Sequence, residues 1–244
     1  MLGVGLIDDV VCLGAWSKLF FQFAVAAASV LGCGLESGRN VFFSILWVLL
    51  LTNAHNFIDG LDGLFAGCAT LEGISLGLLY FLLGRSDAML PPLVLALACL
   101  AFRTYNRYPA QIFAGDCGSG TVGFLFGMLS LPLFYDFSVQ TVALAPLFLF
   151  AYPLTDLFTA VLRRICRGKS PFAADRGHLH HRICAAGLTQ VQCGGVLHIL
   201  CVSLCIVGVL LGSESLHLFA GIGCLGAVMV LLGIRHFILD LANR

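Results

Sequence analysis

Charged side chains are scarce in this chain of 244 residues, where they make up 11% of the sequence against roughly 25% in soluble domains. Hydrophobic residues make up 59%, and the mean hydropathy is +0.99. The formal net charge is zero, and no block of like charge occurs. These shortages argue against a soluble domain and against a disordered charged tail, and they give no sign of a nucleic-acid partner. Such a composition indicates a protein of the lipid bilayer.

The sequence also lacks any CxxC pair, although it contains eleven cysteines. Structural zinc sites commonly use closely spaced cysteine pairs, so this absence argues against one. Most of the cysteines lie within or beside apolar runs, where a free thiol packs as a small hydrophobic side chain. We therefore interpret them as core residues rather than as a disulfide framework.

Apolar runs separated by short polar patches predict an all-α, polytopic membrane protein that forms one domain over residues 1–244. Several runs are shorter than the roughly 20 residues that a membrane span needs, so their ends are approximate. The eight predicted transmembrane helices are residues 19–35, 40–54, 63–84, 89–104, 119–135, 141–162, 193–212 and 216–236. The longest polar stretch, residues 163–192, is expected to be a loop with at most a short helix.

The basic residues indicate the orientation of the chain, since Lys and Arg are enriched in loops that stay in the cytoplasm. Threading the chain through the eight spans puts eleven basic residues on one side and only Arg39 and Arg85 on the other. The acidic and histidine-rich motifs described below fall on the basic side. The sequence therefore predicts that the polar motifs meet at the cytoplasmic face.

Four polar residues recur at helical spacing in the segment NAHNFIDGLDGL. Asp59 and Asp62 are three residues apart, which on a helix places both carboxylates on one face. Two carboxylates without a nearby base require a cation, although a single Asp is also explained as a helix cap. Asn53 and Asn56 repeat the spacing one turn earlier. We interpret them either as ligands for phosphate or sugar hydroxyls or as ordinary turn residues.

Asp8 and Asp9 are adjacent, so on a regular helix their side chains point in different directions. One ligand can hardly engage both of them symmetrically. We therefore expect one to act on a substrate and the other to support it. A solvated end of a membrane helix is the alternative interpretation.

Asp116 lies in the glycine-rich segment GDCGSG, directly before an apolar span. The backbone amides of such a segment can hold a phosphate, while the carboxylate can bind a metal ion. A glycine-rich turn that only begins a helix is the alternative.

Three histidines and two arginines lie within residues 175–182, DRGHLHHR. Cationic side chains at this density suit a ligand that carries phosphate groups. A zinc site is a competing interpretation, because His178 and His181 would share a helical face, but the stretch offers no clear third ligand. An incidental surface loop is the other alternative.

Carboxylates, a glycine-rich turn and a cationic loop on one membrane face are the components of Mg²⁺-assisted phosphoryl transfer. Positioning and charge neutralisation supply most of the catalysis in such reactions, and Mn²⁺ can replace Mg²⁺. An ion-coupled transporter is the rival class, but it would place its acids near the middle of the bilayer. Here the acidic clusters lie at the ends of predicted spans.

The motifs resemble those of the polyprenyl-phosphate N-acetylhexosamine-1-phosphate transferases, also called glycosyltransferase family 4. GLIDDV with the following WSKLFFQ is similar to the family's Asp-Asp motif and its downstream lysine and glutamine, here Lys18 and Gln22. The other three motifs follow in order as NAHNFIDGLDGL, YPAQIFAGDCGS and RGKSPFAADRGHLHHRI. The resemblance thus covers nearly the whole chain.

The resemblance implies transfer of a sugar-1-phosphate from a UDP-sugar to undecaprenyl phosphate at the inner membrane of a bacterium, with release of UMP. The form of the histidine loop favours UDP-GlcNAc as the donor. The alternatives are a phospho-MurNAc-pentapeptide transferase and an inactive fragment. Direct attack, a covalent intermediate and a homodimer all remain open.

By this likeness, Asp59 and Asp116 would hold the metal ion, and Asp62 would support the metal site. Asp8 or Asp9 would deprotonate or orient the lipid phosphate. The residues expected to bind the substrates are Lys18, Asn53, Asn56, Gly115, Ser119, Arg176, His180 and His181, and His178 is expected among the catalytic groups. Family members usually carry further helices before the Asp-Asp motif, so we expect this chain to be shortened at its amino end.

Overall fold

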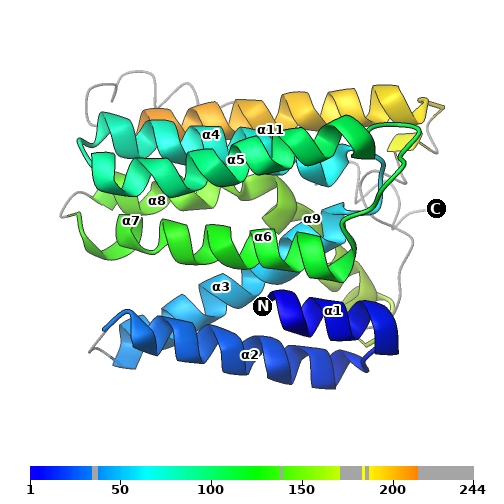
Figure 1. The fold of residues 1–244 in the computed structure, drawn as a ribbon, viewed down its shortest axis with the longest axis horizontal. Coiled ribbons are helices and arrows are strands. Elements are labelled where there is room, and N and C mark those ends of the chain that lie inside the picture. The colour runs from blue at the N-terminus through cyan, green and yellow to red at the C-terminus, as the bar shows by residue number, and fades with distance from the viewer. Residues whose placement is uncertain (35–37, 138–139, 171–182, 185–186, 214–244) are drawn as a thin grey trace.

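The structure is a computed structural model, and it describes residues 1–34, 38–137, 140–170, 183–184 and 187–213 (Figure 1). Within these ranges the regular structure is helical, which confirms the predicted fold class. The helices are α1 (Leu2–Val11), α2 (Ala15–Gly32), α3 (Gly38–Ile58), α4 (Leu64–Leu82), α5 (Ser86–Asn106), α6 (Gly115–Ser130), α7 (Pro132–Tyr135), α8 (Gln140–Leu149), α9 (Ala151–Cys166) and α11 (Gln190–Gly212).

Six segments of the described chain are long and apolar enough to cross a membrane. They are α2, most of α3, α4, α5, α6 together with α7, and α11. The pair α8 and α9 passes the same test jointly. Seven of the eight predicted spans therefore have helical counterparts, and the eighth, residues 216–236, lies outside the described residues. The predicted loop 163–192 is shorter in the structure, because α9 continues to Cys166 and α11 begins at Gln190.

The segment predicted as a span over residues 141–162 is not one straight helix, because α8 and α9 meet at an angle of 67°. Pro153 lies three residues into α9 and has no backbone N–H to donate to the carbonyl of Leu149. The thiol of Cys205 on α11 donates to that carbonyl instead, with a sulfur–oxygen distance of 3.4 Å. The proline thus releases a carbonyl at the bend, and a neighbouring helix satisfies it.

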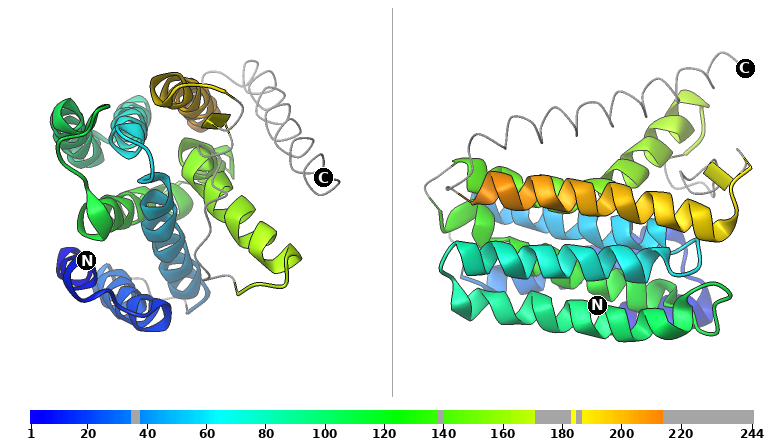
Figure 2. Two further views of the ribbon diagram at one scale, coloured as in Figure 1. Left: turned by 90° about the vertical axis from the view of Figure 1, so that its right-hand side faces the viewer. Right: turned by 90° about the horizontal axis from the view of Figure 1, so that it is seen from above.

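Most of the helices run side by side along the long axis of the molecule (Figures 1 and 2). Because the chain reverses between successive helices, the ends of α1, α3, α5 and α9 and the starts of α2, α4, α6 and α11 lie together. We call this the motif end, since it carries residues 8–18, 53–63 and 106–119. The polar motifs predicted to share one membrane face therefore do lie at one end of the bundle, apart from the histidine-rich stretch, which is outside the described residues.

Burial is greatest at the centre of the bundle and least at its rim. In α4, 72% of the span is buried, whereas the figure is 17% for α2 and for α5. Phe42, Leu97 and Ile199 are each more than 60% exposed. Such a surface is unfavourable in water and suits a lipid environment. Helix α4 is thus the central helix, and α2 and α5 lie at the lipid boundary.

Two glycines bring α6 close to α3. A Cβ atom at Gly123 would lie 2.4 Å from the carbonyl oxygen of Leu51, and one at Gly127 would lie 2.9 Å from the Cα atom of Val48. Small residues spaced four apart allow this kind of backbone approach between membrane helices. The contact places the start of α6 beside the end of α3, where two of the polar motifs are located.

Adding a methyl group at this contact is expected to destabilise the bundle. We expect Gly123→Ala to lower the free energy of unfolding by about 1–3 kcal/mol, as overpacking of a close contact does. Gly195→Ala is the matched control, because a Cβ atom there meets nothing within 4 Å. Thermal unfolding in detergent measures both, and equal midpoints for the two variants would contradict the close packing of α3 and α6.

Candidate active site

Lys18 lies between two carboxylates that come from different helices. Its Nζ atom is 2.9 Å from Oδ2 of Asp8 on α1, and it also forms an ion pair with Asp116 on α6. The other oxygen of Asp8 accepts a hydrogen bond from the backbone N–H of Leu13, at 2.8 Å. Asp8 therefore both shapes the connection between α1 and α2 and fixes the ammonium group at the start of α2.

The second oxygen of Asp116 is engaged by α3. The side-chain amide of Asn56 donates to Oδ1 of Asp116 and, at 3.1 Å, to the hydroxyl oxygen of Ser119. The Ser119 hydroxyl in turn donates to the carbonyl of Gly115, at 2.6 Å. Asp116 is thus held on both oxygens, by Lys18 on one side and by Asn56 on the other.

Asn53 connects α3 to α2 one turn away from Asn56. Its side-chain amide donates to Oε1 of Gln22 and to the carbonyl of Leu49, both at 2.9 Å. Gln22 is buried and lies one turn after Lys18. Lys18 and Gln22 therefore form a polar stripe on α2 that faces the two asparagines and Asp116.

The start of α6 is capped by acidic side chains of the chain itself. Both oxygens of Asp9 accept backbone hydrogen bonds, from Asp116 at 2.9 Å and from Cys117 at 3.0 Å. Negative charge is favoured at the N-terminus of a helix. Gly5 makes the approach possible, since a Cβ atom there would lie 2.4 Å from the Cα atom of Cys117. Asp8 and Asp9 thus point in different directions, as expected from their adjacency, and both reach the neighbourhood of Asp116.

Asp59 also reaches the start of α6, and its carboxyl has an altered acidity. Burial raises its pKa to about 7, and the negative charges of Asp116 and Asp9 add to the increase. A hydrogen bond from the backbone of Gly115 opposes the rise. A half-buried carboxyl that titrates near neutral pH beside other carboxylates is a feature of functional sites.

The first backbone amides of the glycine-rich segment are engaged by groups of the protein itself, and phosphate binding at Gly115 stays a prediction. The amides of Asp116 and Cys117 bind Asp9, and the amide of Gly118 donates to the carbonyl of Ala114. The backbone of Gly115 donates a hydrogen bond to the Asp59 carboxylate. The anions at this helix terminus are therefore carboxylates of the protein.

Asp59 and Asp62 do not share a helical face, contrary to the prediction. Helix α3 ends at Ile58 and α4 begins at Leu64, so both aspartates lie in the turn between them, and Gly63, with a φ of 73°, is the N-cap of α4. Oδ2 of Asp62 accepts a hydrogen bond from the backbone N–H of Ala110, at 3.0 Å. Asp62 thus supports the loop that precedes Asp116, while Asp59 lies beside the carboxylate cluster.

Asn106 is a site residue that the sequence reasoning missed. It is 2% exposed, its Oδ1 accepts from the backbone N–H of Gly63 at 3.1 Å, and its amide donates to the carbonyl of Ile112 at 2.9 Å. The residue therefore ties the turn after Asp59 to the loop before Asp116. An asparagine at a helix end, three residues before a proline, was the available signal.

Loss of this connection is expected to damage the site. Asn106→Ala leaves the buried N–H of Gly63 without an acceptor, which costs about 1–3 kcal/mol of stability. Thr104→Ala is the matched control, since the Thr104 hydroxyl donates to a carbonyl of its own helix at an exposed position. Asn106→Ala should have the lower midpoint of thermal unfolding, and equal midpoints for the two variants would contradict the assignment.

The remaining sequence-predicted residues Arg176, His178, His180 and His181 lie outside the described residues. The fold is that of a polytopic membrane protein. Its carboxylates, a lysine and two asparagines gather at one end of the bundle and form a polar centre. Residues 1–134 match the family model described as Glycosyl transferase family 4. The chain belongs to this family.

Curated relatives agree with the family assignment. The chain is 30% identical over 233 residues to the "Probable undecaprenyl-phosphate N-acetylglucosaminyl 1-phosphate transferase" of Bacillus subtilis, covering 88% of this chain and 64% of the relative. It is 31% identical over 224 residues to the "Decaprenyl-phosphate N-acetylglucosaminephosphotransferase" of Mycobacterium tuberculosis, covering 77% and 55%. A third relative, the "Undecaprenyl-phosphate alpha-N-acetylglucosaminyl 1-phosphate transferase" of Escherichia coli, is 30% identical over 179 residues, covering 69% and 47%. The chain thus spans between about half and two thirds of the length of these relatives.

Proposed function

We propose that this protein transfers GlcNAc-1-phosphate from UDP-GlcNAc to a polyprenyl phosphate, with undecaprenyl phosphate as the favoured acceptor. The observation that carries the proposal is the cluster of Asp8, Lys18, Asn56 and Asp116 at one end of a membrane bundle. The names of the three relatives support GlcNAc-1-phosphate over the phospho-MurNAc-pentapeptide alternative.

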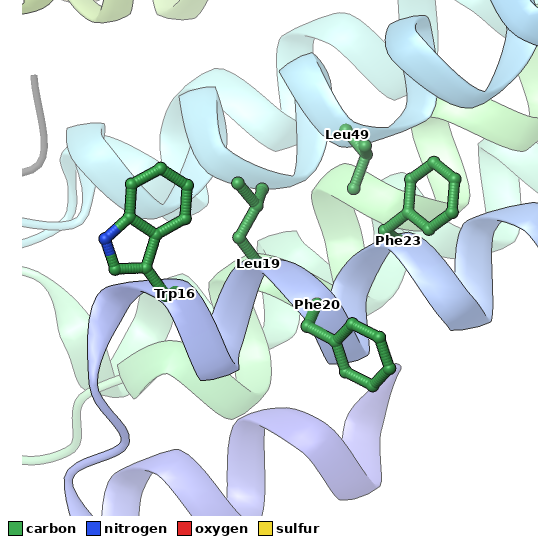
Figure 3. Close-up of a pocket in the computed structure, with 5 residues that line it drawn as sticks. All are labelled: Trp16, Leu19, Phe20, Phe23 and Leu49. Atoms are coloured by element: carbon green, nitrogen blue, oxygen red, sulfur yellow. The ribbon is translucent and has the colours of Figure 1, made fainter.

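An apolar pocket on the two helices that carry Lys18 and Asn56 suits the hydrocarbon part of such an acceptor. It has a volume of about 290 Å³ and lies between α2 and α3 (Figure 3). Its lining residues are Trp16, Leu19, Phe20, Phe23 and Leu49. Burial of apolar surface here would favour an isoprenoid chain. Lys18 lies in the same turns of α2 as Trp16 and Leu19, and in our proposal the phosphate at the head of that chain passes around α2 to the cluster.

The reaction that we propose joins two phosphates. An oxygen of the acceptor phosphate attacks the phosphorus nearest the sugar, a new P–O bond forms, and the bond to the UMP oxygen breaks, so that UMP leaves with the electron pair. The ammonium of Lys18 would attract and orient the acceptor phosphate, and Asp8 would hold that ammonium in place. Asn56 and Ser119 would fix the direction of the Asp116 carboxylate.

A divalent cation fits the donor set of this site. Within the described residues, no group of three or more His, Cys, Asp or Glu side chains is arranged to hold a metal ion. Mg²⁺, however, is commonly bound by one or two carboxylates, with water and substrate phosphates completing its ligands. Asp116 and Asp59 would supply these carboxylates. When bound, Mg²⁺ or Mn²⁺ would neutralise the phosphate charge during transfer.

We also propose that the motif end faces the cytoplasm at the inner membrane of a bacterium. Lys18, Arg103, Arg107 and Arg163 all belong to helices or turns at this end. At the opposite end, Arg85 is paired with Asp87 and Asp136. The excess of basic residues thus lies at the motif end, as expected for cytoplasmic loops.

The transfer assay tests the proposed reaction. Membranes that contain this chain should move radiolabelled GlcNAc-1-phosphate from its UDP donor to undecaprenyl phosphate, in a reaction that requires a divalent cation. Asp59→Asn and Asp116→Asn should each reduce the transfer by at least about 100-fold, because the loss of a metal-binding carboxylate removes several kcal/mol of stabilisation. Full activity of either variant would contradict the assigned site. No transfer by the unaltered chain would contradict the proposed function.

Filling the pocket should weaken binding of the acceptor selectively. We expect Leu49→Trp to raise the KM for undecaprenyl phosphate by about 10-fold, because a lost apolar contact of 1–2 kcal/mol corresponds to roughly that factor. The KM for UDP-GlcNAc should not change. Leu97→Trp is the matched control, since Leu97 is 64% exposed on α5. Equal acceptor KM values for both variants would argue that the chain binds elsewhere.

A further inference from the structure

A histidine and a glutamate form a hydrogen-bonded pair inside the apolar bundle. His55 on α3 and Glu72 on α4 are both 0% exposed, and Nε2 of His55 lies 2.8 Å from Oε2 of Glu72. The imidazole ring lies among the rings of Phe65, Phe126 and Phe150, at centroid distances of 5.4–6.5 Å. Ionisable residues in membrane interiors are costly and commonly have a function. The transfer reaction proposed above uses neither residue.

The hydrogen bonds define how many protons this pair holds. Nδ1 of His55 lies 2.9 Å from the carbonyl oxygen of Leu51, and a carbonyl can only accept, so Nδ1 carries a proton. The contact between Nε2 and Oε2 then shares one further proton. The pair is either an imidazolium with a carboxylate or a neutral imidazole with a carboxylic acid. Its net charge is zero in both forms, which allows it to lie among apolar rings.

The pair joins the two helices that flank the turn carrying Asp59 and Asp62. Helices α3 and α4 otherwise touch little, since α3 packs mainly on α6 and α4 packs mainly on α5 and α11. Among the described residues, the hydrogen bond between His55 and Glu72 joins a side chain of α3 to one of α4. The thiol of Cys201 on α11 lies 4.0 Å from the other oxygen of Glu72. The His55–Glu72 contact is thus a direct polar link between α3 and α4.

The position of His55 links this contact to the site. His55 directly precedes Asn56, whose amide holds Asp116 and Ser119. A rotation or shift of the last turn of α3 would therefore move Asn56 away from Asp116. We propose that His55 and Glu72 are positioning residues, which fix the end of α3 relative to α4 and so aim Asn56 at Asp116. This inference rests on the proposed transfer function.

A merely structural pair would behave differently from a positioning pair. Replacing both members of a buried ion pair by apolar residues is often neutral or favourable for stability. A double variant, His55→Leu with Glu72→Leu, should therefore remain folded. If the pair positions Asn56, the same variant loses catalysis, because small misplacements at a reacting centre are costly.

The experiment compares four purified full-length chains in the transfer assay and in thermal unfolding. Glu72→Gln keeps a hydrogen bond, since its amide N–H can donate to Nε2 of a neutral His55, and it should retain kcat within about twofold. The double leucine variant should unfold near the midpoint of the unaltered chain, while its kcat falls by about 10- to 100-fold. Its KM for undecaprenyl phosphate should be unchanged, because the apolar pocket is intact.

Ser130→Ala is the matched control. It removes a buried hydrogen bond, from Nε1 of Trp47 to the Ser130 hydroxyl at 2.9 Å, close to the opposite end of α6. This variant should lose stability and keep its kcat. Should the double leucine variant fail to fold, Glu72→Met removes the hydrogen bond with little change in length, and the same loss of kcat is expected.

Two results would overturn the inference. Unchanged kcat in a folded variant without the hydrogen bond would show that the pair does not position the site. A loss of kcat in Glu72→Gln as large as in the double leucine variant would show that a hydrogen bond is not what positions it. If the unaltered chain transfers nothing, the proposed function has failed, and amide hydrogen exchange of residues 59–63 decides the inference separately. Exchange there should be faster in the double leucine variant, and equal rates would contradict the positioning role.

Discussion

The arrangement of the motif end depends on how its negative charges are compensated. Four carboxylates from three segments of the chain, Asp8, Asp9, Asp59 and Asp116, gather where the bundle excludes part of the surrounding water. Charges that repel one another in such surroundings are costly unless they are paired. Lys18 forms ion pairs with Asp8 and Asp116. The backbone at the start of α6 donates hydrogen bonds to Asp9 and Asp59. The ion pair of Lys18 with Asp8 and Asp116 therefore holds α1, α2 and α6 in one arrangement.

Close helix packing makes this compensation geometrically possible. Gly5 lets α1 approach the start of α6, and Gly123 lets α6 approach α3. Without these contacts, Asp9 could not reach the amides of α6, and Asn56 could not reach Asp116. Asn106 and Asp62 then fasten the two loops that surround the cluster. The polar cluster thus depends on its acidic side chains and equally on the small residues that let the helices approach one another.

The location of the centre suits a reaction between a lipid and a water-soluble substrate. The cluster lies at the end of the bundle, and an apolar pocket between α2 and α3 includes Trp16 and Leu19, which come from the same turns of α2 as Lys18. In the proposed function, a polyprenyl phosphate would approach through the membrane and its phosphate would meet a nucleotide sugar that comes from the aqueous side. A site in the middle of the bilayer could not receive both. The cluster of four carboxylates therefore favours the proposed transferase over an ion-coupled transporter, which would gather such a cluster near the middle of the bilayer.

Local sequence patterns were sufficient to predict the helical class, the six unbroken spans of the described chain and the gathering of Asp8, Asp59 and Asp116 at one end. These features follow from local patterns, because runs of apolar residues and the spacing of acids act over a few turns. Four other features became visible only in the folded chain: the bend between α8 and α9, the cap of Asp9 on α6, the link of Asn106 between two loops, and the contact of His55 with Glu72. Asp9 and the amide of Asp116 are 107 positions apart in sequence, and a contact of that range leaves no periodic signal. Its partners are selected by how the helices pack, which is set by the whole bundle at once.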